Sequence, residues 1–174
     1  PGPAISLAVS PNGHLVLVGL DRRPNEDVQG RMAVVSYLQG KLRLVHVATE
    51  ARDIIHSVAF SPDGTKAFAG SLDKVIYVYD ALNNFVISTT LVGHSHGVRS
   101  MNVAANNRYM CSQSVKDDIM VWDLASMTAV SRPRDRFEAL ADVEANWSTR
   151  QTLLGVNSLG VFPDNDSADY LLSI

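Results

Sequence analysis

Short apolar runs alternate with turn-forming residues along most of this chain. The clearest run, residues 75–79, carries no charge, and each of its residues favours a β-strand. Ser-Pro-Asn-Gly at 10–13 and Ser-Pro-Asp-Gly at 61–64 place a glycine after Asn or Asp, which favours a tight hairpin turn. The polar stretch at 21–30 is typical of an exposed loop. The pattern therefore predicts an all-β protein made of many short strands.

One sequence unit occurs twice between residues 56 and 123. The first copy ends in Val-Tyr-Asp at Asp80, and the second ends in Val-Trp-Asp at Asp123. The two terminal aspartates lie 43 residues apart. A period of about 40–45 residues that closes on an aromatic-Asp pair is typical of the four-stranded blades of a β-propeller.

The repeat predicts a division of the chain into blades. We expect complete blades at about residues 4–50, 51–93 and 94–132, and part of a fourth at 133–174. Residues 1–174 would then form one propeller segment. Because closing a ring takes about four to eight blades, the chain is expected to be a fragment of a larger propeller or to associate with itself through open blade edges.

The spacing of a Gly-His pair makes the interpretation more specific. Gly93-His94 stands 29 residues before Asp123, and with this spacing the chain resembles the WD40-repeat family. The resemblance implies a buried network that links this histidine to a second-strand Ser or Thr, a turn Asp and a third-strand Trp. Such pairing avoids a penalty of about 1–3 kcal/mol for each buried polar group. The third blade offers these candidates: His94, Ser112 or Ser114, Asp117 and Trp122.

The expected network departs from the family pattern at its acidic position. Lys116 stands where the family has Asp, and Asp117 comes one residue later. In the second blade Asp73 is at the expected distance, but Ala51 occupies the histidine position. We expect these residues to stabilise the blades, and we assign a catalytic role to none of them.

The C-terminal part of the chain is similar to a narrower family. Trp147, a Thr-Leu-Leu-Gly-Val stretch at 152–156 and Gly-Val-Phe-Pro at 160–163 precede an Asp-rich turn. In this order they resemble the repeats of echinoderm microtubule-associated protein-like (EML) proteins. The resemblance implies a non-enzymatic platform that binds tubulin, microtubules or other cytoskeletal partners. The alternative is a WD40 scaffold or adaptor subunit of a multiprotein complex unrelated to microtubules.

Charge and composition narrow the possible partners. The chain has 174 residues and a formal net charge of −3, which argues against a general affinity for nucleic acid or anionic membrane. The single cysteine, Cys111, cannot form an intrachain disulfide. No apolar run reaches the roughly 18–20 residues of a membrane span. We expect a cytoplasmic protein of the cytoskeleton, with the cilium or flagellum as one candidate setting.

Protein partners are expected to meet the loops at the ends of the blades, where successive blades present their turns together. A basic cluster there would favour acidic tubulin. The candidate contact residues are Arg52, Lys74, His96, Arg99, Lys116, Arg132, Arg134 and Arg136. His94 and His96 alone do not make a metal site, because no carboxylate or cysteine cluster accompanies them. No metal and no cofactor are expected.

Overall fold

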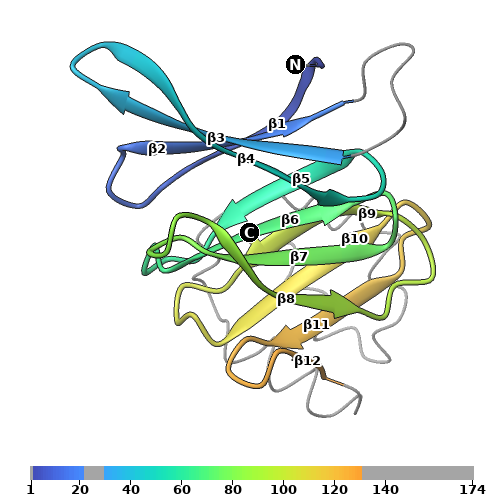
Figure 1. Cartoon of the computed structure of the whole chain (residues 1–174). Helices are drawn as coiled ribbons and strands as arrows, with labels where there is room; N and C mark the ends of the chain where they lie inside the picture. The colour runs from blue at the N-terminus through green and yellow to red at the C-terminus, as the bar shows by residue number, and fades with distance from the viewer. Residues whose placement is uncertain (1, 22–29, 131–174) are drawn as a thin grey trace, which may run out of the picture.

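The computed structural model describes residues 2–21 and 30–130, which form twelve strands and no helix (Figure 1). The strands form three antiparallel sheets of four strands each, and their order in each sheet follows the sequence. Blade 1 consists of β1 (Ala4–Val9), β2 (Leu15–Leu20), β3 (Gly30–Leu38) and β4 (Lys41–Ala51). Blade 2 consists of β5 (Ile55–Phe60), β6 (Lys66–Ser71), β7 (Val75–Asp80) and β8 (Val86–Val92). Blade 3 consists of β9 (Val98–Val103), β10 (Tyr109–Ser114), β11 (Ile119–Asp123) and β12 (Thr128–Ala129).

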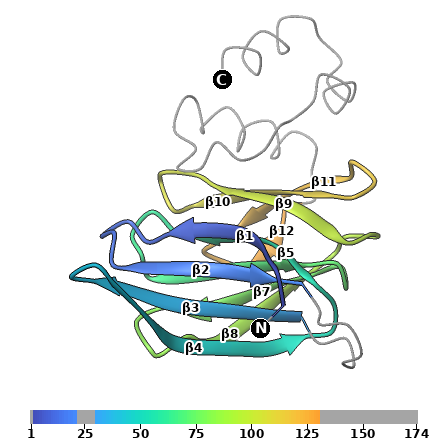
Figure 2. The same cartoon turned by 90° about the horizontal axis from the view of Figure 1, so that it is seen from above.

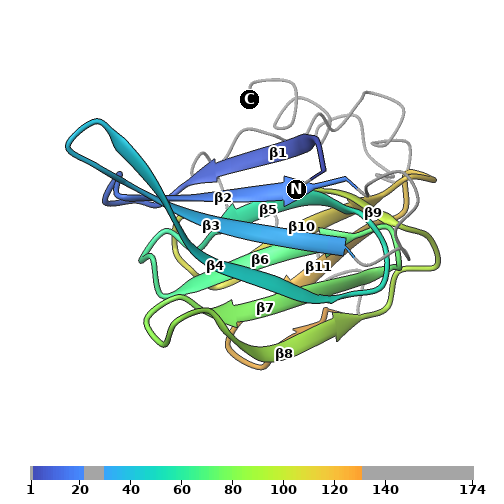
Figure 3. The same cartoon turned by 45° about the horizontal axis from the view of Figure 1, so that its top comes forward.

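The three sheets are stacked in chain order, with blade 2 between the other two (Figures 1 and 3). The first strand of each blade contacts the first strand of the next, β1 against β5 and β5 against β9. The view from above shows the later strands of each blade leading away from these first strands (Figure 2). First strands at the centre and last strands outside are the arrangement of propeller blades. The prediction of an all-β fold built from four-stranded propeller blades is therefore confirmed.

Apolar side chains fill both spaces between the blades. Leu17 and Val34 of blade 1 pack with Phe60 and Tyr79 of blade 2. On the other side of blade 2, buried apolar residues meet those of blade 3, and this second cluster includes Phe68, Val78, Met101 and Trp122. Because both faces of blade 2 are covered, its third strand, β7, reads as a continuous apolar run from Val75 to Tyr79.

Two equivalent glycines let neighbouring blades approach closely. A Cβ atom at Gly19 would lie 2.6 Å from the carbonyl oxygen of Ile55, the first residue of β5. A Cβ atom at Gly70 would lie 2.7 Å from Cγ1 of Val98, the first residue of β9. In each case the second strand of one blade meets the start of the next blade, and a side chain would push the two apart.

The predicted partial blade at 133–174 lies outside the residues that the structure describes. Its assignment stays a prediction. Within the described residues, no helix is long and apolar enough to cross a membrane.

Candidate functional site

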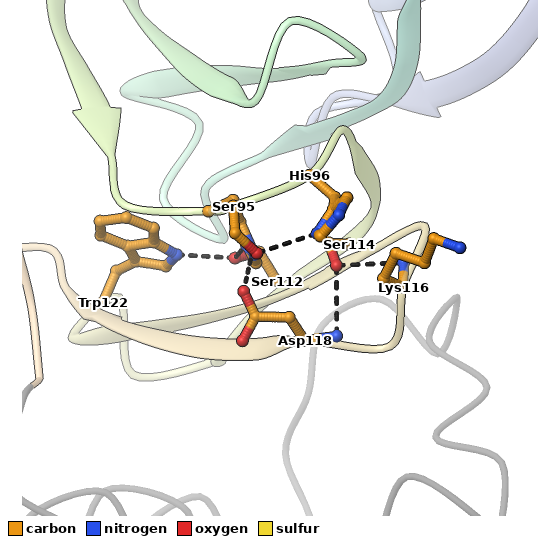
Figure 4. A network of polar contacts seen from close by, with 8 residues as sticks. Ser95, His96, Ser112, Ser114, Lys116, Asp118 and Trp122 are labelled. Carbon is orange, nitrogen blue, oxygen red and sulfur yellow. Dashed lines mark hydrogen bonds and ion pairs between the residues drawn. The ribbon is translucent and has the colours of Figure 1, made fainter.

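A buried polar network ties together the loop before β9 and the two central strands of blade 3. Trp122 Nε1 donates a hydrogen bond of 2.7 Å to Ser112 Oγ. The same oxygen lies 2.6 Å from Nε2 of His94, and Nδ1 of His94 lies 3.3 Å from Oδ2 of Asp118. Figure 4 shows the contact between Trp122 and Ser112, with Asp118 at the other end of the network. The serine is thus the centre of the network.

The donors and acceptors fix the tautomer of the histidine. An ionised carboxylate only accepts hydrogen bonds, so Nδ1 of His94 carries the proton that faces Asp118. Nε2 then accepts from the Ser112 hydroxyl, while that hydroxyl oxygen accepts from the Trp122 indole. Each polar atom in the chain of contacts has a partner, which is the condition for burying it at low cost.

Burial keeps the histidine neutral. The side chain of His94 is 1% exposed, and burial lowers the pKa of His94. The hydrogen bond and charge of Asp118 act in the opposite direction but do not offset the burial. The Asp118 side chain is 42% exposed, so the network reaches solvent at its acidic end.

The structure corrects the predicted acidic member of the network, because Asp118 and not Asp117 faces His94. Asp117 has a φ of 60°, at a tight turn in which Ser114 Oγ accepts hydrogen bonds from the backbone N–H groups of Lys116 and Asp118. This turn directs the Asp117 carboxylate away from the histidine. The carboxylate instead accepts a 3.0 Å hydrogen bond from Nε2 of Gln113. Ser114, the alternative to Ser112, therefore shapes the turn, and the hydroxyl that meets His94 Nε2 is that of Ser112.

Blade 2 holds the equivalent turn with different groups. One Asp73 carboxylate oxygen accepts from the backbone N–H of Arg52 at 2.7 Å and from the Tyr77 hydroxyl at 2.8 Å. The other accepts from the backbone N–H of Val75 at 3.1 Å. Burial, together with the hydrogen bond to Asp73, raises the pKa of Tyr77 to about 12. Tyr79 donates to Glu50 at 3.2 Å, and burial followed by the Glu50 charge raises the pKa of Tyr79.

The two tyrosines were not among the predicted site residues. The family pattern directs attention to histidine, serine and tryptophan, and Ala51 suggested only that the network is missing from blade 2. The available signal was the alternation in β7, because Tyr77 and Tyr79 are two residues apart and so lie on one face of the strand.

The candidate contact residues of the described chain lie at one end of the blades. The connections β4–β5, β6–β7, β8–β9 and β10–β11 all emerge there, and we call this end the loop face. The exposed residues at or beside these connections are Arg52, Lys74, His96, Arg99 and Lys116. The predicted contacts Arg132, Arg134 and Arg136 lie outside the described residues.

The loop face carries both signs of charge. Asp53, Asp73, Asp117 and Asp118 stand among the basic residues. Asp73 already accepts three hydrogen bonds within blade 2, whereas Arg52 and Lys74 are exposed. The loop face is therefore basic in places and is not a uniform positive field.

The two histidines of the His-x-His pattern have different surroundings. His94 is buried in the network, while His96 is exposed and lies with its Nδ1 2.9 Å from Ser95 Oγ (Figure 4). Across residues 2–21 and 30–130, no group of three or more His, Cys, Asp or Glu side chains could hold a metal ion.

Comparison with known families agrees with this architecture. The family model described as "WD domain, G-beta repeat" matches residues 42–80 and 85–123. A solved crystal structure of RRP9 WD40 repeats matches with a TM-score of 0.64 and 20% identity, over 74% of this chain and 37% of that one. That likeness concerns the fold alone. The chain therefore contains two WD40 repeats, at residues 42–80 and 85–123.

Curated relatives share a narrower name. The chain is 28% identical to mouse echinoderm microtubule-associated protein-like 3 over 163 residues, which is 91% of this chain and 17% of that protein. It is also 28% identical to human echinoderm microtubule-associated protein-like 1, over 96% of this chain and 19% of that protein. Xenopus laevis echinoderm microtubule-associated protein-like 4 matches at 28% over 72% of the chain and 14% of that protein. The chain therefore spans less than a fifth of the length of these relatives.

Proposed function

We propose that this chain is a non-enzymatic interaction platform of an EML-like microtubule-associated protein. Its loop face would bind tubulin or microtubules, and its place in the cell would be the cytoplasm and its cytoskeleton. The observation that supports this most strongly is the combination of EML relatives along nearly the whole chain with exposed cations on one end of the blades. The mechanism is recognition by several loops on one rigid frame.

The loop backbones are held in place before any partner arrives. The backbone N–H of Arg52 is held by Asp73 at 2.7 Å, and the turn at Lys74, where φ is 78°, is closed by a backbone bond to Ser71 at 3.2 Å. Fixing these backbones in advance lowers the entropy lost on binding. The backbone positions that carry the exposed side chains of Arg52 and Lys74 are therefore fixed.

Charge supports an acidic partner. Arg52 and Lys74 lie on neighbouring loops of blade 2, and Asp73 between them is engaged by three donors. An acidic protein such as tubulin would be attracted to this pair, and the attraction would weaken as salt screens it. Binding should therefore fall as the ionic strength rises.

Co-sedimentation with polymerised tubulin, together with pull-down of unpolymerised dimer, tests this proposal in the full-length protein. The double variant Arg52→Glu, Lys74→Glu is expected to weaken binding at least several-fold. Lys41→Glu is the matched control, because Lys41 is an exposed cation at the opposite end of blade 1. Absence of binding to both forms of tubulin would contradict the proposal, as would equal binding by the double variant and the wild type.

The second candidate is a WD40 scaffold that serves a complex unrelated to microtubules. The mixed charge of the loop face, with four aspartates among its cations, favours this alternative over a purely electrostatic tubulin site. Affinity capture of partners by the wild type and by the Arg52→Glu, Lys74→Glu variant distinguishes the two candidate functions. A scaffold of the second kind would retain a non-tubulin partner and show no tubulin binding.

A further inference from the structure

The outer edge of blade 2 is open even though a blade lies on either side of it. β8 ends the sheet order β5-β6-β7-β8, and among the described strands it pairs with β7 alone. The neighbouring blades cover the two faces of blade 2 and leave this edge outside. Because further blades of a ring also stack on faces, β8 stays at the rim when the propeller is complete.

Apolar side chains along this edge are exposed with both neighbouring blades in place. Val86 is 53% exposed, Ile87 37% and Val92 70%. Leu91, in the same strand, is 1% exposed and anchors β8 in the buried cluster shared with blade 3. The exposure of β8 therefore belongs to the rim of the blade, and a missing neighbour does not cause it.

β8 has few of the features that normally keep one sheet edge from pairing with another. Its seven residues, VISTTLV, include no charge and no proline, and five of them are β-branched. The outer strand of blade 1, β4, carries Lys41, Arg43 and Glu50, and the outer strand of blade 3, β12, is two residues long. Charges and short length are the usual protections of an edge strand. Of these three outer strands, β8 is therefore the one suited to accept another strand.

The order of residue classes in β8 is the same in both directions. Aliphatic residues occupy the two ends, and hydroxyl residues occupy the centre at 88–90. If two β8 strands pair antiparallel about Thr89, the opposing residues are Val86–Val92, Ile87–Leu91, Ser88–Thr90 and Thr89–Thr89. Each aliphatic side chain then meets another, each hydroxyl meets another, and no like charges face each other. The strand is thus complementary to a second copy of itself.

We propose that β8 binds β8 of a second copy of this chain, antiparallel and centred on Thr89. A two-fold axis through this point relates the two strands, and main-chain hydrogen bonds join the two four-stranded sheets into one. β8 ends at the loop face, where the β8–β9 connection emerges. Because the paired strands run in opposite directions, the loop faces of the two copies point to opposite sides. This association does not depend on tubulin binding.

A bulge and the small contact area limit the strength of the expected dimer. At Ser88 the register with β7 shifts between the pairs Val78–Thr89 and Tyr79–Ile87, and a bulge disrupts the row of backbone groups locally. A single pair of seven-residue strands, about 23 Å long, buries less surface than the roughly 1,600 Å² of a standard interface. The dimer is therefore expected to dissociate on dilution.

Cysteine cross-linking in the full-length protein tests the register of the two strands. In Thr89→Cys the introduced thiols face each other across the axis, with Cβ atoms about 4.5–5.5 Å apart, so mild oxidation should join two copies. Val92→Cys is the matched control, because its two thiols would lie about 20 Å apart and should not be joined. The natural Cys111 is buried, and the wild type is the reference for any other cysteine. Denaturing gels without reductant measure the cross-linked fraction.

A second pair of positions keeps the test decisive if Thr89→Cys fails to fold. Residue 86 of one copy lies opposite residue 92 of the other in the proposed register. The double variant Val86→Cys, Val92→Cys should therefore cross-link, while Val86→Cys alone and Val92→Cys alone should not. Both side chains are exposed, so the fold should survive these changes.

A charge exchange at the axis tests the same contact without a covalent bond. Sedimentation velocity should show the wild type shifting to twice its mass as the concentration rises. Thr89→Lys and Thr89→Glu should each abolish this shift, because like charges then lie directly opposite each other, and an equimolar mixture of the two variants should restore it. Leu82→Lys, at an exposed position in the β7–β8 turn, is the control and should associate like the wild type.

Three results would each overturn the proposal. The first is a wild type without the concentration-dependent shift and a Thr89→Cys variant without a cross-link, which is also what an edge covered by another segment or another protein would give. The second is association that Thr89→Lys and Thr89→Glu both retain. The third is equal cross-linking of Thr89→Cys and Val92→Cys, which would indicate contact without the proposed register.

Discussion

Blades 2 and 3 have equivalent strands and turns, but different side chains stabilise their loop-face turns. Blade 3 buries three polar groups, on His94, Ser112 and Trp122. The positions 43 residues earlier are Ala51, Ala69 and Tyr79. Two of these positions have lost their polar group, and Tyr79 sends its hydroxyl outward to Glu50.

The difference indicates that the buried polar groups are either all present in a blade or all absent from it. A histidine or an indole left alone in blade 2 would lack a partner and would cost about 1–3 kcal/mol. Removing all of them, or keeping all of them, avoids that cost. Blade 2 then uses Asp73 and Tyr77 to hold the turn that Asp118 and His94 hold in blade 3.

Removing the central hydroxyl of blade 3 should have the largest effect. Ser112→Ala leaves the Trp122 indole N–H and the His94 ring without their shared partner, at an expected cost of about 2–4 kcal/mol. Urea denaturation measures the free energy of unfolding. Ser126→Ala, in an exposed turn of the same blade, should change it little. Equal stability of Ser112→Ala and wild type would contradict the network.

Adding the missing hydroxyl to blade 2 should also destabilise the chain. Ala69 is fully buried, and Ala69→Ser would place a polar group between apolar neighbours, with an expected cost of about 1–3 kcal/mol. The control is Ala125→Ser, at an exposed turn position. A neutral result in thermal unfolding would mean that blade 2 already provides a partner for a hydroxyl at this site, and the contrast with blade 3 would disappear.

The two adjacent aspartates should respond differently. Asp118→Asn weakens the contact with the His94 N–H, and because Asp118 is partly exposed the expected cost is about 1 kcal/mol. Asp117→Asn keeps an acceptor for Gln113 and should cost no more than a few tenths of a kcal/mol. The melting temperatures of the two variants show which substitution costs more stability. The reverse order would restore Asp117 as the acidic member of the network.

The smallest expected effect is a pH dependence. Burial lowers the pKa of His94 in the folded chain. As the pH falls through 6.5, His94 is therefore protonated in the unfolded chain before it is protonated in the folded chain. Stability should therefore decrease between pH 7 and the lowered pKa of His94. His94→Gln should lose this part of the dependence, and His96→Gln should keep it. A pH profile that His94→Gln leaves unchanged would contradict the assignment.

Sequence patterns predicted the blades but not every partner within them. The 43-residue period was sufficient for the all-β fold. The resemblance marked by Gly93-His94 implied His94 and Trp122 as network members but left Ser112 and Ser114 as alternatives, and the structure selects Ser112. The prediction of the acidic residue was wrong because it did not take the backbone conformation of the turn into account. Spacing from Trp122 points to Lys116, and Asp117 is the nearest acidic residue in the sequence. The positive φ of Asp117 turns its side chain away, and Asp118 contacts the histidine instead.

A double-mutant cycle on Ser112→Ala and Trp122→Phe tests most directly whether the network of blade 3 acts as a unit. The measured quantity is the free energy of unfolding of the two single variants, the double variant and the wild type. If the groups depend on each other, the double variant loses less than the sum of the single losses, by at least about 1 kcal/mol. Losses that simply add would contradict the account.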